Sequence, residues 1–264
     1  MIQQLDQVVD HQDPVPSRPA RSADEYRFHA EGAEHIVVVD RDEAGAKAVA
    51  ASVSGTGVGC DVTDEAAIRS IVEMTEQDIG PIGLFVSNAG YVTMGGLEAP
   101  VEDLTRMFDV HVLAHLYAAR AVIPYMADRG DGYLLNTASA AGLLSQFGSL
   151  HYAVTKHAAV ALAEWVAITH GHQGIKVSVL CPQAVHTNIG PNSPDADKIV
   201  GTGADVAGAD GTLTTEDVAD TVIAALREER FHVLPHADVE EYVKRKGADV
   251  DRWIGGMQRW QNAM

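Results

Sequence analysis

The amino-acid sequence predicts an α/β domain of three layers, in which helices cover both faces of a doubly wound parallel sheet. Short apolar runs, which suit strands buried on both faces, alternate with longer segments of helical periodicity. No linker rich in proline, serine or charge interrupts this alternation, and 264 residues are enough for one such unit. We therefore expect a single domain over residues 1–264.

The expected strands are the apolar runs, and the expected helices are the periodic segments between them. The strands are predicted at residues 35–39 (HIVVV), 84–87 (LFVS), 133–136 (YLLN), 176–180 (KVSVL) and 231–234 (FHVL). The helices are predicted at residues 42–51, 64–77, 104–126, 153–170 and 216–227. Thr214 and Asp217 have the spacing of a capping box at the start of the last helix.

Two segments lie outside this alternation. Residues 190–212 hold five glycines and two prolines without sustained periodicity, which is typical of a lid over a substrate site or of a partly disordered loop. Residues 236–264 are predicted to form a C-terminal helical tail. Its residues Trp253, Met257 and Trp260 share one face, which we expect to pack on the body of the protein or on another subunit.

The composition excludes several classes of partner. Lys and Arg number 19 against 37 Asp and Glu, for a net charge of −18, so neither nucleic acid nor an anionic membrane surface is expected as a partner. No apolar stretch approaches the ~20 residues of a membrane span, and the first residues lack the pattern of a secretory signal. Cys60 and Cys181 are expected as two reduced, buried thiols, which predicts a cytoplasmic protein.

The strongest candidate for chemistry is the set Ser139, Tyr152 and Lys156. Tyr152 and Lys156 lie one turn apart near the start of an expected helix, so their side chains share a face. A phenol with a pKa of about 10 is a poor acid or base at neutral pH, and a neighbouring ammonium lowers that pKa. A serine hydroxyl then holds a carbonyl or alcohol oxygen beside the phenol. This set predicts acid–base catalysis at an oxygen whose carbon gives or receives hydride.

Further motifs surround this set. Ser139 precedes Tyr152 by 13 residues, Asn88-Ala89-Gly90 follows the strand LFVS, and Cys60-Asp61-Val62 follows an earlier segment. With these motifs, and most specifically with TASAAGLL and YAVTKHAAVALAEW, the chain from about Ala30 onward resembles the classical short-chain dehydrogenase/reductase family. The resemblance implies a Rossmann fold, a nicotinamide cofactor and a homotetramer or homodimer. It also implies Tyr152 as acid/base, Lys156 as the group that lowers the tyrosine pKa and holds the nicotinamide ribose, and Ser139 as ligand of the substrate oxygen.

The same resemblance assigns the cofactor positions. Asp40 ends the strand VVVD, where a carboxylate accepts hydrogen bonds from ribose hydroxyls and repels a 2′-phosphate, so NAD is expected and NADP is less favoured. Arg41 follows it directly. The other implied cofactor positions are Asp61, Val62, Asn88, Ala89, Gly90, Tyr152, Lys156, Pro182, Val185 and Thr187. Gln183 stands where the family has a glycine after the proline.

Two departures from the family pattern stand out. His111 occupies the position of the family's fourth catalytic residue, an asparagine that supports a proton relay, and we include His111 in the expected catalytic set because histidine also donates and accepts. His115 lies one turn further on, a metal-binding spacing for which the sequence suggests no third ligand, so no metal is expected.

The larger departure is at the N-terminus. Residues 1–31 contain no glycine, although the family has a glycine-rich phosphate loop there, and Pro14, Pro16 and Pro19 each lack the N–H that a pyrophosphate needs. Residues 1–30 are therefore an atypical segment. Three explanations stay open: weak or different cofactor binding, a pseudoenzyme that has lost its cofactor, or a segment foreign to the protein.

The leading hypothesis is an oxidoreductase that interconverts a small secondary alcohol and a ketone with NAD. Two interpretations of Leu143, Leu144 and Phe147 stay open: they shape a pocket for an apolar or mid-sized alcohol, or they pack in the core. The alternative is a non-catalytic member of the family, a pseudoenzyme or binding subunit with impaired dinucleotide binding. A metal-dependent hydrolase built on His111 and His115 would explain none of the other motifs.

Overall fold

The protein is built around one parallel sheet of seven strands. The computed structural model describes residues 2–3, 23–190, 193–194 and 211–263, and within them the strand order is β3-β2-β1-β4-β5-β6-β7. The strands are β1 (Ile2–Gln3), β2 (Val37–Asp40), β3 (Thr56–Gly59), β4 (Leu84–Ser87), β5 (Gly132–Thr137), β6 (Ile175–Leu180) and β7 (His232–Val233). This order confirms the predicted doubly wound sheet, with the chain reversing direction across the sheet between β1 and β4.

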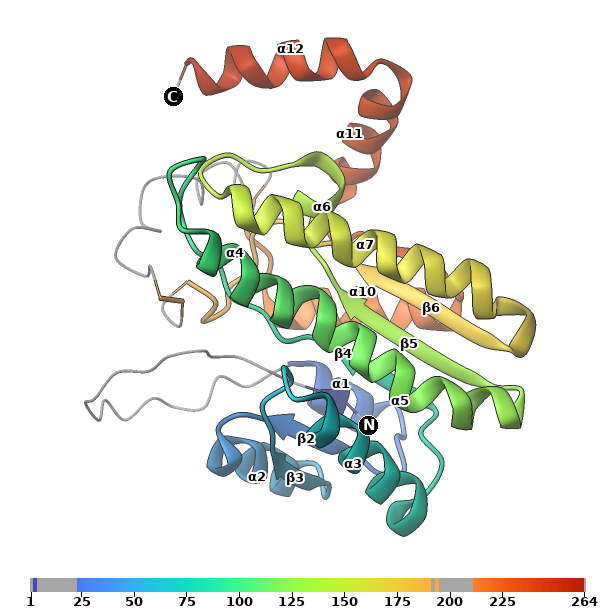
Figure 1. The fold of residues 1–264 in the computed structure, drawn as a ribbon. Helices are drawn as coiled ribbons and strands as arrows, with labels where there is room; N and C mark the ends of the chain where they lie inside the picture. The colour runs from blue at the N-terminus through green and yellow to red at the C-terminus, as the bar shows by residue number, and fades with distance from the viewer. Residues whose placement is uncertain (1, 4–22, 191–192, 195–210, 264) are drawn as a thin grey trace.

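Helices cover both faces of the sheet (Figure 1). The helices are α1 (Ala23–Ala30), α2 (Glu43–Ser52), α3 (Glu65–Met74), α4 (Val101–Phe108), α5 (Ala114–Arg129), α6 (Ala141–Leu144), α7 (Leu150–His170), α10 (Thr215–Arg227), α11 (Ala237–Ala248) and α12 (Val250–Gln261). Successive strand residues point to opposite faces. Val37 and Val39 therefore pack with α3, α5 and α7, whereas Val38 packs with α1, α2 and α10.

Some boundaries and two strands differ from the sequence prediction. Strand β3 has the sequence TGVG, whose one apolar side chain gives no alternating pattern. A Cβ atom at Gly57 would lie 2.5 Å from the Cα atom of Lys47, so glycine lets α2 pack directly on this strand. Strand β1 was also not predicted; Ile2 pairs with Val38 and with Val86, which makes the start of the atypical segment part of the sheet.

The predicted helix over residues 104–126 begins earlier and is not uniform. It consists of α4, a π-helical turn η2 (Asp109–Leu113) and α5. A second π-helical turn, η1 (Thr75–Ile79), extends α3. Such turns add one residue to the helix and are frequent at functional sites. A 3-10 turn, η3 (Gly171–Gln173), follows α7.

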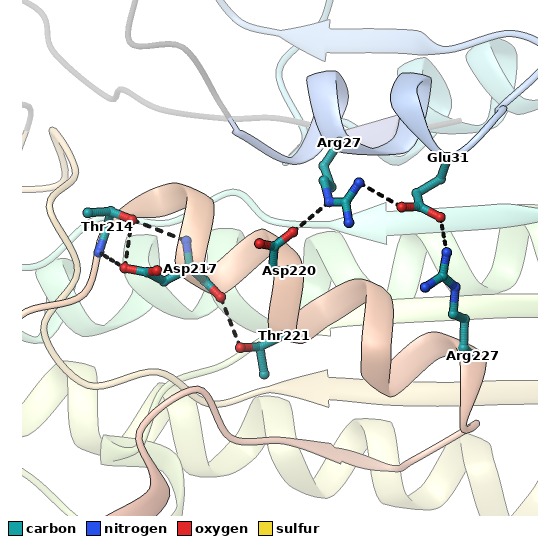
Figure 2. Close-up of polar contacts among 7 residues, drawn as sticks. All are labelled: Arg27, Glu31, Thr214, Asp217, Asp220, Thr221 and Arg227. Carbon is teal, nitrogen blue, oxygen red and sulfur yellow. Dashed lines mark hydrogen bonds and ion pairs between the residues drawn. The ribbon is translucent and has the colours of Figure 1, made fainter.

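Ion pairs attach α1 to α10 (Figure 2). The Arg27 side chain pairs with Glu31 at 2.6 Å and with Asp220 at 2.6 Å, and Glu31 also pairs with Arg227. The predicted capping box of α10 is confirmed: the Asp217 amide donates to Thr214 Oγ1 and the Thr214 amide donates to the Asp217 carboxylate, both at 3.1 Å. Helix α1, which forms the end of the atypical segment, is thus fixed to the body.

The C-terminal residues form the predicted helical tail. Val239 on α11 is fully buried against Ala140 and Leu144, so α11 packs against α6. Helix α12 lies at the top of Figure 1, and its Trp260 ring contacts the ring of Phe147 at 5.8 Å between centroids. None of the described helices combines the length and apolarity needed to cross a membrane.

Candidate active site

The predicted site residues converge on the carboxyl edge of the sheet. Asp40 ends β2, Asp61 follows β3, Asn88 follows β4 and Ser139 follows β5. Because all the strands are parallel, these ends lie along one edge, where α/β proteins bind their ligands. Pro182 follows β6 at the same edge.

Ser139 and Tyr152 form a hydrogen-bonded hydroxyl pair. Ser139 is 8% exposed; its Oγ accepts the Ala141 amide at 3.1 Å and donates to the Pro182 carbonyl at 3.4 Å. The Tyr152 hydroxyl therefore meets a serine whose position is set from two sides. This pair can hold and protonate one substrate oxygen.

The start of α7 brings Tyr152 and Lys156 to this serine. Ser149 caps the helix: its Oγ accepts the Tyr152 amide at 3.3 Å and donates to the Thr93 carbonyl at 2.6 Å. Lys156 follows one turn later, where its Nζ donates to the Thr137 carbonyl at 3.0 Å and lies 5.5 Å from the centre of the Tyr152 ring. The predicted triad is thus brought together.

The direction of the tyrosine pKa shift corrects one expectation. We expected Lys156 to lower the pKa of Tyr152, but burial raises that pKa, and the hydrogen bond from Ser139 lowers it only in part. The Lys156 ammonium is directed to the Thr137 carbonyl instead of the phenol oxygen. Burial lowers the pKa of Lys156 itself to about 8. Tyr152 is therefore a protonated phenol at neutral pH.

His111 lies in the π-helical turn η2 and is fully buried. Its Nε2 accepts the Tyr91 amide at 3.3 Å, so the proton of the neutral ring is on Nδ1, which faces Thr155 Oγ1 at 2.9 Å. Burial holds the pKa of His111 well below its usual range. A Cβ atom at Gly90 would lie 3.3 Å from His111 Nε2 and 3.6 Å from Lys156 Nζ, so the His111 ring and the Lys156 ammonium both lie close to Gly90.

His115 is buried one turn after His111, and neither of its ring nitrogens has a hydrogen-bond partner among the described residues. Burial lowers its pKa to about 3, so the ring is neutral. Across the part of the chain that the structure describes, no three His, Cys, Asp or Glu side chains gather in a way that could hold a metal ion.

The expected cofactor residues have partners that orient them. Asp40 is half-buried and its Oδ1 accepts the Asp42 amide at 2.7 Å, whereas Arg41 is exposed. Asp61 Oδ1 accepts the Thr63 amide at 2.9 Å. At the ends of β4 and β5, the buried hydroxyls of Ser87 and Thr137 have no partner among the described residues. The carboxyl edge of the sheet therefore carries the Asp40 carboxylate, the turn at Gly90 and these two hydroxyls. These groups fit the ribose and amide groups of a dinucleotide.

The remaining expected positions follow β4 and β6. Ala89 is buried, and Val185 pairs with Leu213 in an isolated parallel bridge that closes the base of the expected lid. Thr187 is exposed, and its hydroxyl accepts the Ile189 amide at 3.4 Å. Val62 is buried beside Asp61. Most of the expected lid, and residues 4–22 of the atypical segment, lie outside the described residues.

Comparison with known proteins decides the family. A family model described as "Enoyl-(Acyl carrier protein) reductase" matches residues 26–233. A solved short-chain dehydrogenase/reductase from Burkholderia phymatum, in complex with NAD, has a TM-score of 0.75 and 26% identity, covering 86% of this chain and 89% of that one. This chain belongs to the classical short-chain dehydrogenase/reductase family.

Curated relatives of this short-chain dehydrogenase/reductase are named for oxidoreductases. It is 31% identical over 238 residues to 1-deoxy-11-beta-hydroxypentalenate dehydrogenase of Streptomyces exfoliatus, covering 86% of this chain and 83% of that protein. It is 36% identical over 153 residues to a Xanthobacter autotrophicus protein named "Inactive 2-(S)-hydroxypropyl-CoM dehydrogenase 2", covering 57% of this chain and 66% of that protein. The oxidoreductase hypothesis is supported, and the pseudoenzyme is not favoured.

The sequence did not indicate the residues that hold the triad in place. Thr155 links the ring of His111 to the carbonyl of His151, because its Oγ1 donates to that oxygen at 2.9 Å. Ser193, at the lid base, is buried, and its Oγ accepts the Val92 amide at 3.0 Å. Both residues act through contacts far apart in the sequence, which short motifs do not reveal.

Proposed function

We propose that this short-chain dehydrogenase/reductase transfers a hydride between NAD(H) and a small secondary alcohol or ketone, with Tyr152 as acid/base. The observation that carries the proposal is that Ser139, after the end of β5, lies beside Tyr152 near the start of α7, with Lys156 one turn further on and its Nζ 5.5 Å from the centre of the Tyr152 ring. When bound, the nicotinamide ring supplies or accepts the hydride.

The chain's own residues handle the oxygen and its proton. Ser139 turns its hydroxyl proton from the Pro182 carbonyl to the ketone oxygen and thereby aligns that oxygen with the Tyr152 hydroxyl. Tyr152 keeps its proton at neutral pH because burial raises its pKa, which suits proton donation during ketone reduction. Lys156 places a positive charge below the phenol ring and stabilises the phenolate that forms when the proton leaves.

His111 keeps its place in the proposed catalytic set, with a defined task. Its ring joins the Tyr91 amide, just after the turn of Asn88, Ala89 and Gly90, to Thr155 on α7. It thus holds the strand-end turn against the helix that carries the tyrosine.

NAD is the proposed cofactor because Asp40 presents a carboxylate at the end of β2 while Arg41 is exposed to solvent. Asp40 would hold the adenosine ribose, and Asp61 and Val62 would flank the adenine. Asn88, Ala89, Gly90, Tyr152, Lys156, Pro182, Val185 and Thr187 would line the ribose and nicotinamide end. The solved relative from Burkholderia phymatum contains NAD.

We also propose a cytoplasmic homodimer or homotetramer. Both cysteines are free and buried, as a reducing compartment would keep them. Helix α7 exposes Val154 (45%), Trp165 (59%) and Ile168 (84%) along one side, an apolar stripe that suits a contact with a second copy.

Binding and turnover are tested separately. We expect NADH binding to be measurable by nicotinamide fluorescence. The variant Tyr152→Phe should abolish ketone reduction, because the phenol hydroxyl acts on the substrate proton. Its dissociation constant for NADH should stay within about twofold of the wild-type value. Thermal unfolding of both proteins is the control for folding. Absence of binding at millimolar NADH, or undiminished turnover by Tyr152→Phe, would contradict the proposal.

A further inference from the structure

His236 stands at the start of α11 and bridges two backbone groups of the turn after β6. Its Nδ1 accepts the Gln183 amide at 3.2 Å, and its Nε2 lies 3.1 Å from the Ala184 carbonyl. Because Nδ1 accepts an N–H, the ring proton of the neutral imidazole is on Nε2 and is donated to that carbonyl. The side chain is 5% exposed. One imidazole therefore fixes two successive peptide groups.

The turn that His236 holds is also the support of Ser139. The Pro182 carbonyl accepts the Ala140 amide at 2.8 Å and the Ser139 hydroxyl at 3.4 Å. The contacts form a continuous path from the imidazole, through the Pro182–Ala184 backbone, to the hydroxyl that meets Tyr152. A displacement of the turn would move the acceptor that orients Ser139.

The rest of α11 contacts the residues that follow Ser139. Val239 is fully buried against Ala140 and Leu144, and Lys246 Nζ donates to the Leu143 carbonyl. Figure 1 shows α11 beside α6, the short helix that begins two residues after Ser139. The family match ends at residue 233, so the whole of α11 lies beyond it.

We propose that His236 is a positioning residue for the reaction: it fixes the Pro182–Ala184 turn and, through that turn, the hydroxyl of Ser139. The inference rests on the proposed function, because it assigns His236 to the same oxygen-binding group. The two hydrogen bonds of the His236 ring go to main-chain groups, so we assign it a role in positioning.

A double-mutant cycle separates positioning from general stabilisation. We expect His236→Ala to lower kcat for ketone reduction by roughly ten- to a hundredfold with the KM for NADH little changed, since misplaced catalytic groups lose rate more than binding. In a Ser139→Ala background, the same substitution should lower kcat by less than about twofold. Equal losses in both backgrounds, or no loss in the first, would overturn the proposal.

The conservative variant His236→Gln keeps an acceptor and a donor on one side chain and should recover most of the lost kcat. The control is Lys244→Ala, which changes an exposed side chain on the same helix, α11. It should leave kcat unchanged. Thermal unfolding measured for each variant shows whether it is folded. If folded His236→Gln has a kcat no higher than that of His236→Ala, the role of the two hydrogen bonds is overturned.

Amide hydrogen exchange at Gln183 provides a readout that does not need turnover. We expect this amide to exchange at least about tenfold faster in His236→Ala than in the wild type and in His236→Gln, because its acceptor is removed. Unchanged exchange would overturn the proposal. If the wild type reduces no ketone but the exchange result holds, the proposed function fails while the positioning of the turn stands.

Discussion

The ammonium of Lys156 is enclosed by protein, at 2% exposure, and its pKa falls to about 8 because burial disfavours the charge. In an unfolded chain the pKa of lysine is about 10.4. Below pH 8 both states are protonated, so the folded state carries the whole desolvation penalty. Between the two pKa values the unfolded state binds more protons, and stability from this group rises with pH.

Replacement of this lysine by methionine tests that penalty. We expect the free energy of unfolding of Lys156→Met, relative to the wild type, to fall by about 2 to 3 kcal/mol between pH 7 and pH 10, as the wild type loses its buried charge. Urea unfolding at both pH values measures it. The control is Lys47→Met, at an exposed lysine. An equal change in the free energy of unfolding between the two pH values in both variants would refute a buried charge at position 156.

The carboxylate of Asp40 is expected to set the cofactor preference. Asp40→Asn keeps an oxygen that accepts the Asp42 amide but removes the charge that repels a 2′-phosphate. The ratio of kcat/KM for NADH to that for NADPH should therefore fall about tenfold, which is the effect of ~1.4 kcal/mol. Arg41→Ala, at the exposed neighbouring side chain, should change the ratio much less; an unchanged ratio in Asp40→Asn would argue against this assignment.

The sequence indicated residues that act through short spacings and missed those that act at a distance. Ser139, Tyr152 and Lys156 were found because a strand end and one helical turn bring them together. His236 contacts Gln183 across 53 positions, and no local pattern indicates such a pair. The pKa of Tyr152 was expected in the wrong direction because burial raises it more than the Ser139 hydrogen bond lowers it, and burial depends on the complete fold.

Elements with apolar faces were predicted well, and elements without them were not. Strands β4, β5 and β6 carry continuous apolar runs that are buried on both faces, so composition reveals them. Strand β3 has one apolar residue and depends on close packing by α2. The π-helical turn at His111 was also not predicted from the sequence, because one added residue leaves the apolar pattern of the helix almost unchanged.

The close approach of α2 to β3 gives a prediction for Gly57. Gly57→Ala should lower the free energy of unfolding by about 1 to 3 kcal/mol, because the added methyl group would meet the backbone of Lys47. Gly171→Ala is a matched control at an open position with φ of −57°, where alanine should be neutral or slightly stabilising. Equal effects in denaturant unfolding would show that packing at β3 is not the cause.

At the scale of the whole molecule, the apolar side of α7 should govern assembly. We expect the wild type to be a dimer or tetramer by light scattering, and Trp165→Glu with Ile168→Glu to reduce it to smaller species, because two charges cannot be buried unpaired in an apolar contact. Ile254→Glu, at a comparably exposed apolar position on α12, should leave the assembly intact. Dissociation by Ile254→Glu alone would place the interface on the tail.

A single main-chain oxygen, that of Ala184, joins three parts of the molecule: it receives the His236 ring N–H and the Leu213 amide, each at 3.1 Å. A backbone acceptor is the same whatever side chain position 184 carries. Natural or engineered variation can therefore change that side chain without loosening the junction. The constraint falls on position 236, so a library that diversifies the turn after β6 should vary residue 184 freely and leave the histidine intact.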